Sequence, residues 1–472
     1  MEDPDQARQT AVEEFFQQHP GIPFAVPSSP NYTALRATFI VDNPAVPIAI
    51  ARPQNNEDVC ALVRFSVAHD VPFVVRSGGN NLFGKSQVHG ALTIDMRDIK
   101  YCRVDESKTS ARIGGGILAG DLVESLSAEG VMAVSGTVRF IGYVGWSTYG
   151  GYGPFSANYG YGFEQILAAK VVNWKGEIVD AEADLLRGIR GAGGSFGIIV
   201  EMTIVVCPLT KMISGFLSYD TKEVTDTVTA YCKGLQALRD GGWPKPLCFA
   251  PLFLCTPDGL KLLSHFMWSE DDEDAGSQWL GKVSELALNL RSSVRKATLL
   301  EAIGDFDTAI PPDGRGVVDT ISLRRLTDEA VAVIAAYMER MPRHAGNGFA
   351  IHVAPRPAEA SAGDAVFAVA EEHYMLELLA TPRAAEGLDE SRRWGSDFVR
   401  ALLATDEGNI LPATYINLTP PGRNTLENIF GDKFAAVMDL KRKYDPQDVF
   451  KLATPFSYIP ATSQGESRNE NL

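Results

Sequence analysis

The spacing of hydrophobic and polar positions predicts a strand, a helix and a second strand early in the chain. Residues 56–69 carry apolar side chains at helical intervals, and the runs 46–52 and 72–75 on either side are short and apolar, as buried strands are. In such a unit the residues after the second strand, here 76–81, reach a sheet edge where ligands commonly bind. Further short strands are predicted over 91–96, 101–104, 110–113, 167–174, 177–180 and 198–206, and a helix over 118–129.

The pattern changes near Cys207-Pro208. From there to about residue 405, amphipathic helices alternate with apolar strands, which predicts an α+β fold with an antiparallel sheet. Helices are predicted over 226–240, 277–289, 327–341 and 390–403, and strands over 247–255, 260–268, 348–354 and 373–380. After this part, residues 415–417 are predicted as a strand, 432–444 as a helix, and the polar residues after 460 as a disordered tail.

One stretch, residues 134–162, is too rich in glycine for a helix or a packed strand, and it also carries many Tyr and Trp side chains. We therefore expect a long loop. Glycine allows backbone N–H groups to approach a ligand closely, and aromatic rings can cover an apolar face. This composition favours a site for a flat, anionic cofactor, although a surface loop without a ligand has the same composition.

A second glycine cluster, residues 188–197, does not meet the requirements of a dinucleotide-binding Rossmann motif. The sixth position of a motif starting at Gly191 is Phe196, no strand precedes it, and a β-branched strand follows it in place of a helix. We expect a second loop that offers backbone N–H groups to a ligand.

Charge and composition exclude several classes of partner. The net charge is −16, without a basic stripe, so neither nucleic acid nor an anionic membrane is an expected partner. The six cysteines show no metal-ligand spacing and no regular disulfide pattern, and no metal site is predicted. The acidic N-terminus has no signal-peptide pattern and no transmembrane run occurs, so we expect a cytoplasmic protein, a monomer or a homodimer, that acts on a small molecule.

Several motifs in order along the chain resemble the berberine bridge enzyme-like branch of the vanillyl-alcohol oxidase superfamily, whose FAD-binding domain is of the PCMH type. The resemblance covers nearly the whole chain, and ordered motifs over this length are more specific than one glycine loop. The motifs are Arg76-Ser-Gly-Gly, Leu92-Thr-Ile-Asp95, Ser135-Gly-Thr137, Gly150-Gly-Tyr-Gly-Pro154, Tyr159-Gly160, Gly193-Gly-Ser-Phe-Gly197, Tyr415-Ile-Asn417 and Tyr444-Asp-Pro446.

This resemblance implies an α+β protein with an FAD-binding domain over 1–207, made of two subdomains that divide near 105. A substrate domain would follow over 208–405, and a C-terminal segment over 406–472 would complete the FAD-binding domain. The cofactor-binding residues implied are Arg76, Ser77, Gly78, Gly79, Asn80, Asn81, Gly84, Ser135, Gly136, Val138, Ile141, Gly142, Gly145, Gly150, Gly151, Gly153, Ile199, Tyr415 and Asn417.

Two departures from the family pattern concern the cofactor's attachment. Members often hold FAD covalently through a His and a Cys, but these positions are Asn80 and Val138, and neither side chain can form the bond. FAD is therefore expected to bind non-covalently. The resemblance also places Ile141 near the flavin atom that O2 approaches, where a larger side chain slows reoxidation.

The candidate catalytic residues lie in the predicted strands that would face the flavin. Glu377 shares one strand face with His373 and Met375, so it is either a desolvated general base or a residue on a solvated face. His352 and His265 also lie in apolar strands, as bases or as buried core histidines. The glycine-rich stretch also carries four large residues that are expected either to shape the pocket or to stack structurally: Arg139, Tyr143, Trp146 and Tyr149.

The function implied by the resemblance is an FAD-dependent oxidoreductase, an oxidase or dehydrogenase. It would transfer a hydride from a small specialised metabolite to FAD while a base takes the proton. A second hypothesis is a cyclase that keeps the flavin without net redox turnover and orients its substrate in the pocket. A third is a flavin-loaded binding protein without catalysis.

Overall fold

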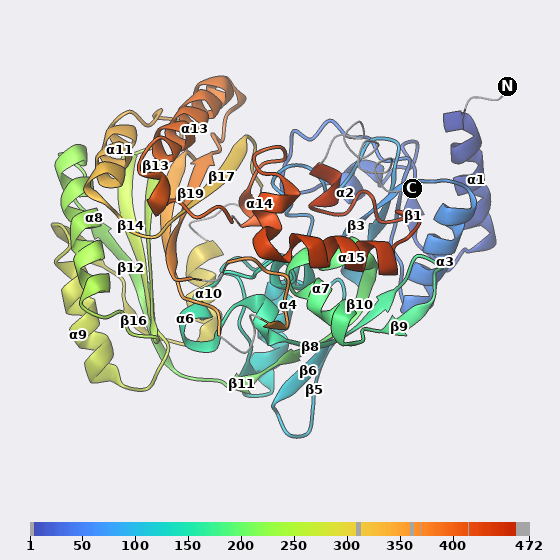
Figure 1. Cartoon of the computed structure of the whole chain (residues 1–472), viewed down its shortest axis with the longest axis horizontal. Coiled ribbons are helices and arrows are strands. Elements are labelled where there is room, and N and C mark those ends of the chain that lie inside the picture. The colour runs from blue at the N-terminus through green and yellow to red at the C-terminus, as the bar shows by residue number, and fades with distance from the viewer. Residues whose placement is uncertain (1–3, 308–312, 359–362, 370, 414, 459–472) are drawn as a thin grey trace.

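A computed structural model describes residues 4–307, 313–358, 363–369, 371–413 and 415–458. Figure 1 shows these residues arranged around a small N-terminal sheet, a second antiparallel sheet and a large third sheet. The predicted strand–helix–strand unit is confirmed. In the first sheet β2 (Ala49–Ala51) and β3 (Phe73–Arg76) both pair in parallel with β4 (Leu92–Asp95), and α3 (Asn56–Ala68) connects β2 to β3. The remaining elements of this part are α1 (Pro4–Gln18), β1 (Phe24–Ala25) and α2 (Tyr32–Arg36).

The second sheet follows at once, because β4 ends at Asp95 and the next strand begins at Cys102. Its strands run antiparallel in the order β5-β6-β10-β8-β9, and α4 and α7 pack with it around a shared hydrophobic core. The element bounds are β5 (Cys102–Val104), β6 (Ser110–Gly114), α4 (Ala119–Ala128), β8 (Ile166–Val172), β9 (Ile178–Asp180), α7 (Ala183–Ala192) and β10 (Ile198–Val205). A separate pair joins β7 (Val131–Met132) to β11 (Cys207–Pro208).

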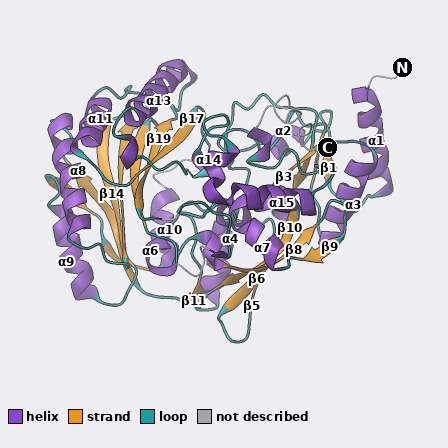
Figure 2. Cartoon of the chain, in the orientation of Figure 1, coloured by secondary structure: helices purple, strands orange, loops and turns teal. Residues whose placement is uncertain are grey.

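The third sheet is antiparallel in the order β15-β12-β14-β13-β18-β19-β17, with β16 paired to β12. In Figure 2 the helices α8, α9, α11 and α13 lie on the outer side of the sheet, whereas α10 lies on the inner side, which faces the N-terminal half. The strands are β12 (Met212–Tyr219), β13 (Leu247–Thr256), β14 (Gly259–Trp268), β15 (Asn289–Ser292), β16 (Arg295–Ala297), β17 (Val317–Leu323), β18 (Gly348–Ala354) and β19 (His373–Ala380). The helices are α8 (Val224–Asp240), α9 (Glu273–Ser284), α10 (Leu299–Asp307), α11 (Asp328–Glu339) and α13 (Leu388–Leu403).

Strand alternation decides which side chains meet these helices. On β13 and β19 every second residue is buried in a core shared with α8, α11 and α13, for example Phe253, Leu376 and Leu378. The residues between them face the opposite way, toward the N-terminal half of the chain. The predicted partition of β19, with Met375, Glu377 and Leu379 on one face, is confirmed.

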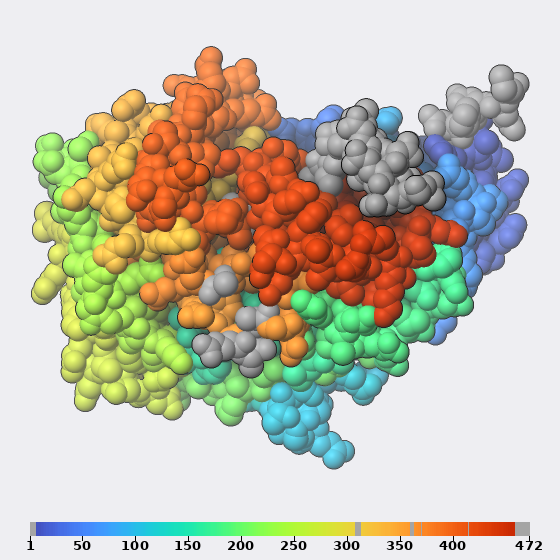
Figure 3. Space-filling view, in the orientation of Figure 1, coloured from blue at the N-terminus to red at the C-terminus, as the bar shows by residue number. Residues whose placement is uncertain are grey.

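The C-terminal part of the chain returns to the second sheet. Helices α14 (Leu426–Phe430) and α15 (Phe434–Tyr444) belong to the same core as α4 and α7. Figure 3 shows this red segment covering the face of the molecule between the orange part of the third sheet and the green residues. The residues predicted as a disordered tail lie outside the described residues.

Three sequence predictions of secondary structure are wrong in part. The glycine-rich segment 134–162 is not one loop, because it forms α5 (Tyr143–Ser147) and α6 (Ser156–Tyr159). Residues 416–418 form a 3-10 turn in place of the predicted strand. The second glycine cluster begins inside α7, which loses helical geometry at Arg190 and Gly191.

Candidate functional site

A cavity of about 710 Å³ lies between the loops of the N-terminal half and the inner face of the third sheet. Its first wall comes mainly from residues 77–82, 136–138, 140–142, 144–146 and 148–149 and from the C-terminal residues 450 and 452–454. Its second wall comes from β13, β18 and β19. A ligand of this volume would therefore touch both halves of the fold.

Two loops of the first wall approach each other so closely that both need glycine. A Cβ added at Gly78 would lie 2.3 Å from the nitrogen of Gly142, and one added at Gly142 would lie 2.3 Å from Ser77 Oγ. Asn80 connects the loops, since its Nδ2 donates hydrogen bonds to the carbonyl oxygens of Gly78 at 3.2 Å and Phe140 at 2.5 Å. Asn80 thus has a structural role at the position where the family resemblance would place a histidine tether.

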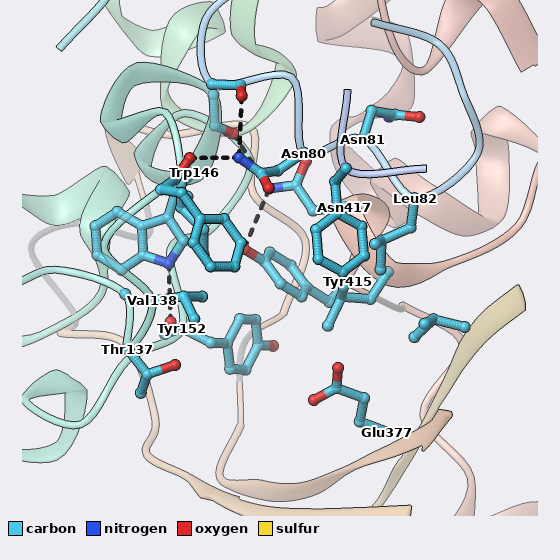
Figure 4. A pocket seen from close by; sticks show the side chains of 18 of the residues that line it. Asn80, Asn81, Leu82, Thr137, Val138, Trp146, Tyr152, Glu377, Tyr415 and Asn417 are labelled. Atoms are coloured by element: carbon cyan, nitrogen blue, oxygen red, sulfur yellow. Dashed lines mark hydrogen bonds between the residues drawn. The ribbon is translucent and has the colours of Figure 1, made fainter. Parts of the chain in front are cut away.

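These loops offer free donors to the cavity. Within the described residues, the backbone N–H groups of Gly78, Gly79, Asn80 and Gly136 donate to no backbone or side-chain acceptor. Such consecutive N–H groups bind phosphate and other anionic oxygens well. Figure 4 shows Asn80 and Asn81 at one side of the cavity and Thr137 and Val138 at another.

The same wall has room for a flat aromatic group. A Cβ added at Gly145 or Gly194 would meet no atom within 4 Å, so these two glycines leave cavity space that a side chain would fill. Val75, although it is on β3, exposes 41% of its surface and lines the cavity. Free N–H donors, missing Cβ atoms and an exposed apolar strand residue together fit the phosphates and rings of FAD.

Not all of the predicted cofactor residues reach this wall. Among the nineteen positions named above, the five outside the wall are Arg76, Gly84, Ser135, Gly150 and Gly151. Each faces protein instead: Gly84 lies against Asn43, Gly150 against Phe367 and Gly151 against Gly162, and Ser135 is fully buried. The prediction that these five residues contact the cofactor directly is therefore corrected: they lie behind the cavity wall and support it.

The contacts of Arg76 explain why the sequence suggested, wrongly, that it binds the cofactor. It ends β3 as predicted, but its side chain is fully buried and donates to Asp95 Oδ2 and to the carbonyl oxygen of Leu35, both at 2.6 Å. Burial opposes ionisation of Asp95, but hydrogen bonds and the charges of Arg97 and Arg76 outweigh it and lower the pKa of this carboxyl. The pair fixes the base of the loop rather than holding phosphate.

The second wall presents one pair of ionisable side chains in contact. Glu377 on β19 lies opposite Ala350, and His352 on β18 lies opposite Met375, so the two side chains are diagonal neighbours on the cavity face. His352 Nε2 is 3.0 Å from Glu377 Oε2. Their side chains are 33% and 20% exposed, which leaves both accessible from the cavity. An ionised carboxylate only accepts hydrogen bonds, so His352 Nε2 donates to it.

Tyr415 and Asn417, predicted to close the site, do line the cavity. Asn417 Nδ2 donates to the Tyr415 hydroxyl oxygen and to the carbonyl oxygen of Gly145, both at 3.1 Å. Burial raises the pKa of Tyr415. The hydrogen bond from Asn417 opposes this rise and the charge of Glu377 adds to it, but burial dominates, so this phenol keeps its proton. Since its oxygen accepts from Asn417, its O–H group remains available as a donor.

A second tyrosine, Tyr152, has the opposite hydrogen-bonding role. His373 Nδ1 is 2.9 Å from the carbonyl oxygen of Glu371, and a carbonyl can only accept, so Nδ1 carries the proton. Burial lowers the pKa of His373 to about 4, which leaves its Nε2 as an acceptor 3.1 Å from the Tyr152 hydroxyl. Tyr152 therefore donates its hydroxyl proton to His373, and its hydroxyl oxygen keeps the capacity to accept. Its ring centre lies 4.7 Å from that of Tyr415.

Two predicted catalytic residues are poorly placed. Tyr143 is fully buried in the core and absent from the cavity wall, because the first turn of α5 directs it against Trp146, so its catalytic assignment is corrected. His265 borders one end of the cavity but is 2% exposed, with Nε2 3.1 Å from Ser214 Oγ. Burial lowers the pKa of His265 to about 3, which makes it a weak base.

Sequence reasoning missed several residues of the wall. Tyr152 was within the glycine-rich segment, and its aromatic character was the available signal. Trp146, which was expected to shape the pocket, does line the cavity. The other missed positions gave no local signal, because they line the cavity only after distant segments meet; they include Leu82, Phe140, Phe450, Thr454, Arg315 and Arg383. No cluster of three or more metal-ligating side chains occurs among the residues that the structure describes.

Comparison with known proteins agrees with this geometry. Residues 47–182 match the family described as "FAD binding domain". The FAD-linked oxidoreductase aurO of Gibberella zeae is 27% identical over 90% of this chain and 83% of its own length. BBE-like 1 of Physcomitrella patens superposes with a TM-score of 0.82 at 18% identity over 94% of this chain and 99% of its own. Glucooligosaccharide oxidase of Acremonium strictum, described with a 6-S-cysteinyl, 8α-N1-histidyl FAD, superposes with a TM-score of 0.82 at 18% identity over 93% and 97%.

The chain thus has the α+β fold of the PCMH-type and berberine bridge enzyme-like flavoproteins, and it is an FAD-dependent oxidoreductase. The resemblance noted in the sequence is confirmed. Within the described part of the chain, no helix is both long enough and apolar enough to span a bilayer.

Proposed function

We propose that this protein oxidises a small organic metabolite by transferring a hydride to non-covalently bound FAD, with Glu377 as the base. The observation that carries the proposal is the contact of 3.0 Å between Glu377 Oε2 and His352 Nε2 on the cavity face of the third sheet. Figure 4 shows Glu377 across the cavity from Thr137 and Val138. These two residues belong to the wall against which the flavin would lie. In this arrangement residues 1–207 and 406–458 would hold the cofactor, and residues 208–405 would hold the substrate.

The chain's own residues supply the acid–base chemistry of the proposal. Glu377 Oε1 makes no hydrogen bond with a described residue, so it is free to accept a proton from a substrate hydroxyl or amine. His352 Nε2 holds the other carboxylate oxygen in place. Tyr415 can donate its O–H group to a substrate oxygen, and Tyr152 can accept through its own oxygen. FAD, when bound, supplies the hydride acceptor.

Non-covalent attachment is part of the proposal. Asn80 and Val138 both line the cavity, at the positions where the family carries its tethers. Neither has a nucleophilic atom. Asn80 has in addition committed its amide to the carbonyl oxygens of the loops, which supports a role in shaping the site.

Anaerobic mixing of the yellow protein with a panel of metabolites tests the proposal. The true substrate should bleach the flavin absorbance in the absence of O2, and the oxidised product should appear in equal amount. Conversion of a substrate without any bleaching would contradict hydride transfer and would support the non-redox cyclase instead.

A further inference from the structure

Five charged side chains line the cavity within the described residues, and they are unevenly placed. They are Lys85, Asp313, Arg315, Glu377 and Arg383. Three are cationic in a protein whose net charge is −16, so this concentration of positive charge is unusual for the chain. Lys85 belongs to the cofactor wall, whereas Arg315 and Arg383 border the third sheet.

Arg315 and Arg383 lie at the same end of two paired strands. Val317 of β17 pairs with Ala380 of β19, so residues just before β17 and just after β19 meet. The structure confirms this closeness, since a Cβ added at Gly316 would lie 2.2 Å from the carbonyl oxygen of Ala380. Both arginines therefore occupy one rim of the cavity.

Neither arginine side chain is paired with a described residue. Among the described residues, no carboxylate or carbonyl accepts a hydrogen bond or ion pair from the guanidinium of Arg315 or Arg383. Of the described residues that line the cavity, Asp313 is the one acidic side chain near this rim, so the two arginines leave a surplus of positive charge there. Guanidinium groups bind carboxylates and other oxyanions through paired hydrogen bonds.

An apolar path connects this rim to Glu377. Alternate residues of β19 and its extension line the cavity, from Glu377 through Leu379 and Thr381 to Arg383. Six residues at roughly 3.3 Å each give an upper limit of about 20 Å for the separation of the two ends. Val318 from β17 and Leu254 from β13 widen the apolar surface between them.

Resting on the proposed function, we propose that the substrate is an elongated apolar molecule whose far end carries an oxyanion, of the carboxylate class, bound by Arg315 and Arg383. The oxidised carbon would lie near Glu377, and the anionic group would lie at the rim. The alternative use of these cations, neutralising the phosphates of FAD, predicts that their loss releases the cofactor.

Equilibrium binding to the FAD-loaded protein tests this without requiring turnover. Decanoate, decan-1-ol and hexanoate are titrated calorimetrically into wild type, Arg315→Met, Arg383→Met and the double variant, with Arg393→Met, an exposed arginine on α13, as the matched control. Wild type and Arg393→Met should bind decanoate at least about tenfold more tightly than decan-1-ol, and more tightly than hexanoate. Each cavity variant should lose part of this preference, and the double variant all of it.

Two further measurements separate the possible failures. Glu377→Gln should keep the decanoate preference, so a failed catalytic proposal leaves this one standing. FAD content should be unchanged in the arginine variants. Three results would each overturn the proposal: equal binding of decanoate and decan-1-ol to wild type, a preference for decanoate that survives in the double variant, or loss of FAD from the arginine variants. If the double variant does not fold, the comparison of wild type with the two single variants still decides the question.

Discussion

Glu377 and His352 contact each other across two neighbouring strands, with Oε2 and Nε2 3.0 Å apart, although 24 residues separate them in the sequence. The register of β18 and β19 creates the contact, because Glu377 pairs with Ala350 and His352 with Met375. Alanine at position 350 leaves space above the strand for both side chains. The pair therefore depends on sheet register as much as on residue identity.

The first prediction concerns attachment of the cofactor. Because Asn80 and Val138 cannot form a covalent bond, denaturing the yellow protein in acid should release all of its flavin into the supernatant. A fluorescent protein band after denaturing electrophoresis would show covalent attachment. A covalently flavinylated protein treated in parallel provides the positive control.

The second prediction tests the cofactor cavity. Gly145→Val should weaken FAD binding at least about tenfold, because the new side chain would occupy space that the glycine leaves open to the ligand. Gly281→Val in α9 is the matched control, since Gly281 is likewise helical and free of neighbours within 4 Å, and it lies on the exposed surface. Fluorescence titration of the two apo-proteins with FAD makes the comparison. Equal affinities would place the cofactor elsewhere.

The third prediction follows from the buried, neutral His373. Its pKa falls from an ordinary 6.5 to about 4 on folding, because burial disfavours the charged ring. A depressed pKa contributes stability that is complete above pH 6.5 and is lost as the pH falls through about 4. Between pH 7.5 and pH 4.5 this amounts to about 2 to 3 kcal/mol in the free energy of unfolding.

Urea denaturation of wild type and His373→Asn at the two pH values measures this effect. Wild type should lose more stability than the variant on acidification. His344→Asn, at a half-exposed histidine on the surface, should behave as wild type does. An identical acid response in wild type and His373→Asn would mean that His373 is not held neutral.

The fourth prediction concerns oxygen. Ile141 lines the cavity, and the family resemblance places it where O2 reaches the flavin. After anaerobic reduction, wild type should reoxidise slowly in aerated buffer, and Ile141→Val should reoxidise faster because one methylene is removed. Ile351→Val, buried on the helix side of the third sheet, is the control. If wild type reoxidises rapidly and Ile141→Val reoxidises at the same rate, Ile141 does not limit the access of O2 to the flavin.

Much of the fold was predictable where one side of an element is apolar. α3, β13, β14 and the two faces of β19 follow the expected periodicities closely. The strand β17 was missed because its cavity-side residues, Thr320 and Ser322, are polar and its outer face includes Asp319, which blurs the alternation. The turn at 416–418 was mistaken for a strand because its shape depends on contacts such as Asn417 with Gly145, far away in sequence.

Some features of the candidate site were likewise predictable from the sequence, and others were not. Glycines at positions 78 and 142 signalled close backbone approach, and both are required where two loops touch. The contact between Glu377 and His352 was not predictable, because it depends on the register of two strands joined by a long connection. Arg76 was misplaced because sequence cannot tell a buried ion pair from a phosphate ligand at the same strand end.

The most direct test of the central claim is the rate of substrate-dependent flavin reduction, followed anaerobically by stopped flow in wild type, Glu377→Gln and His352→Gln. The surface pair of His344 and Glu390, 2.8 Å apart, supplies the matched controls His344→Gln and Glu390→Gln. Glu377→Gln should retain FAD and slow reduction by a factor on the order of 10² to 10⁴, His352→Gln should slow it less, and the controls should match wild type. A reduction rate in Glu377→Gln equal to that of wild type would contradict the assignment of Glu377 as the base.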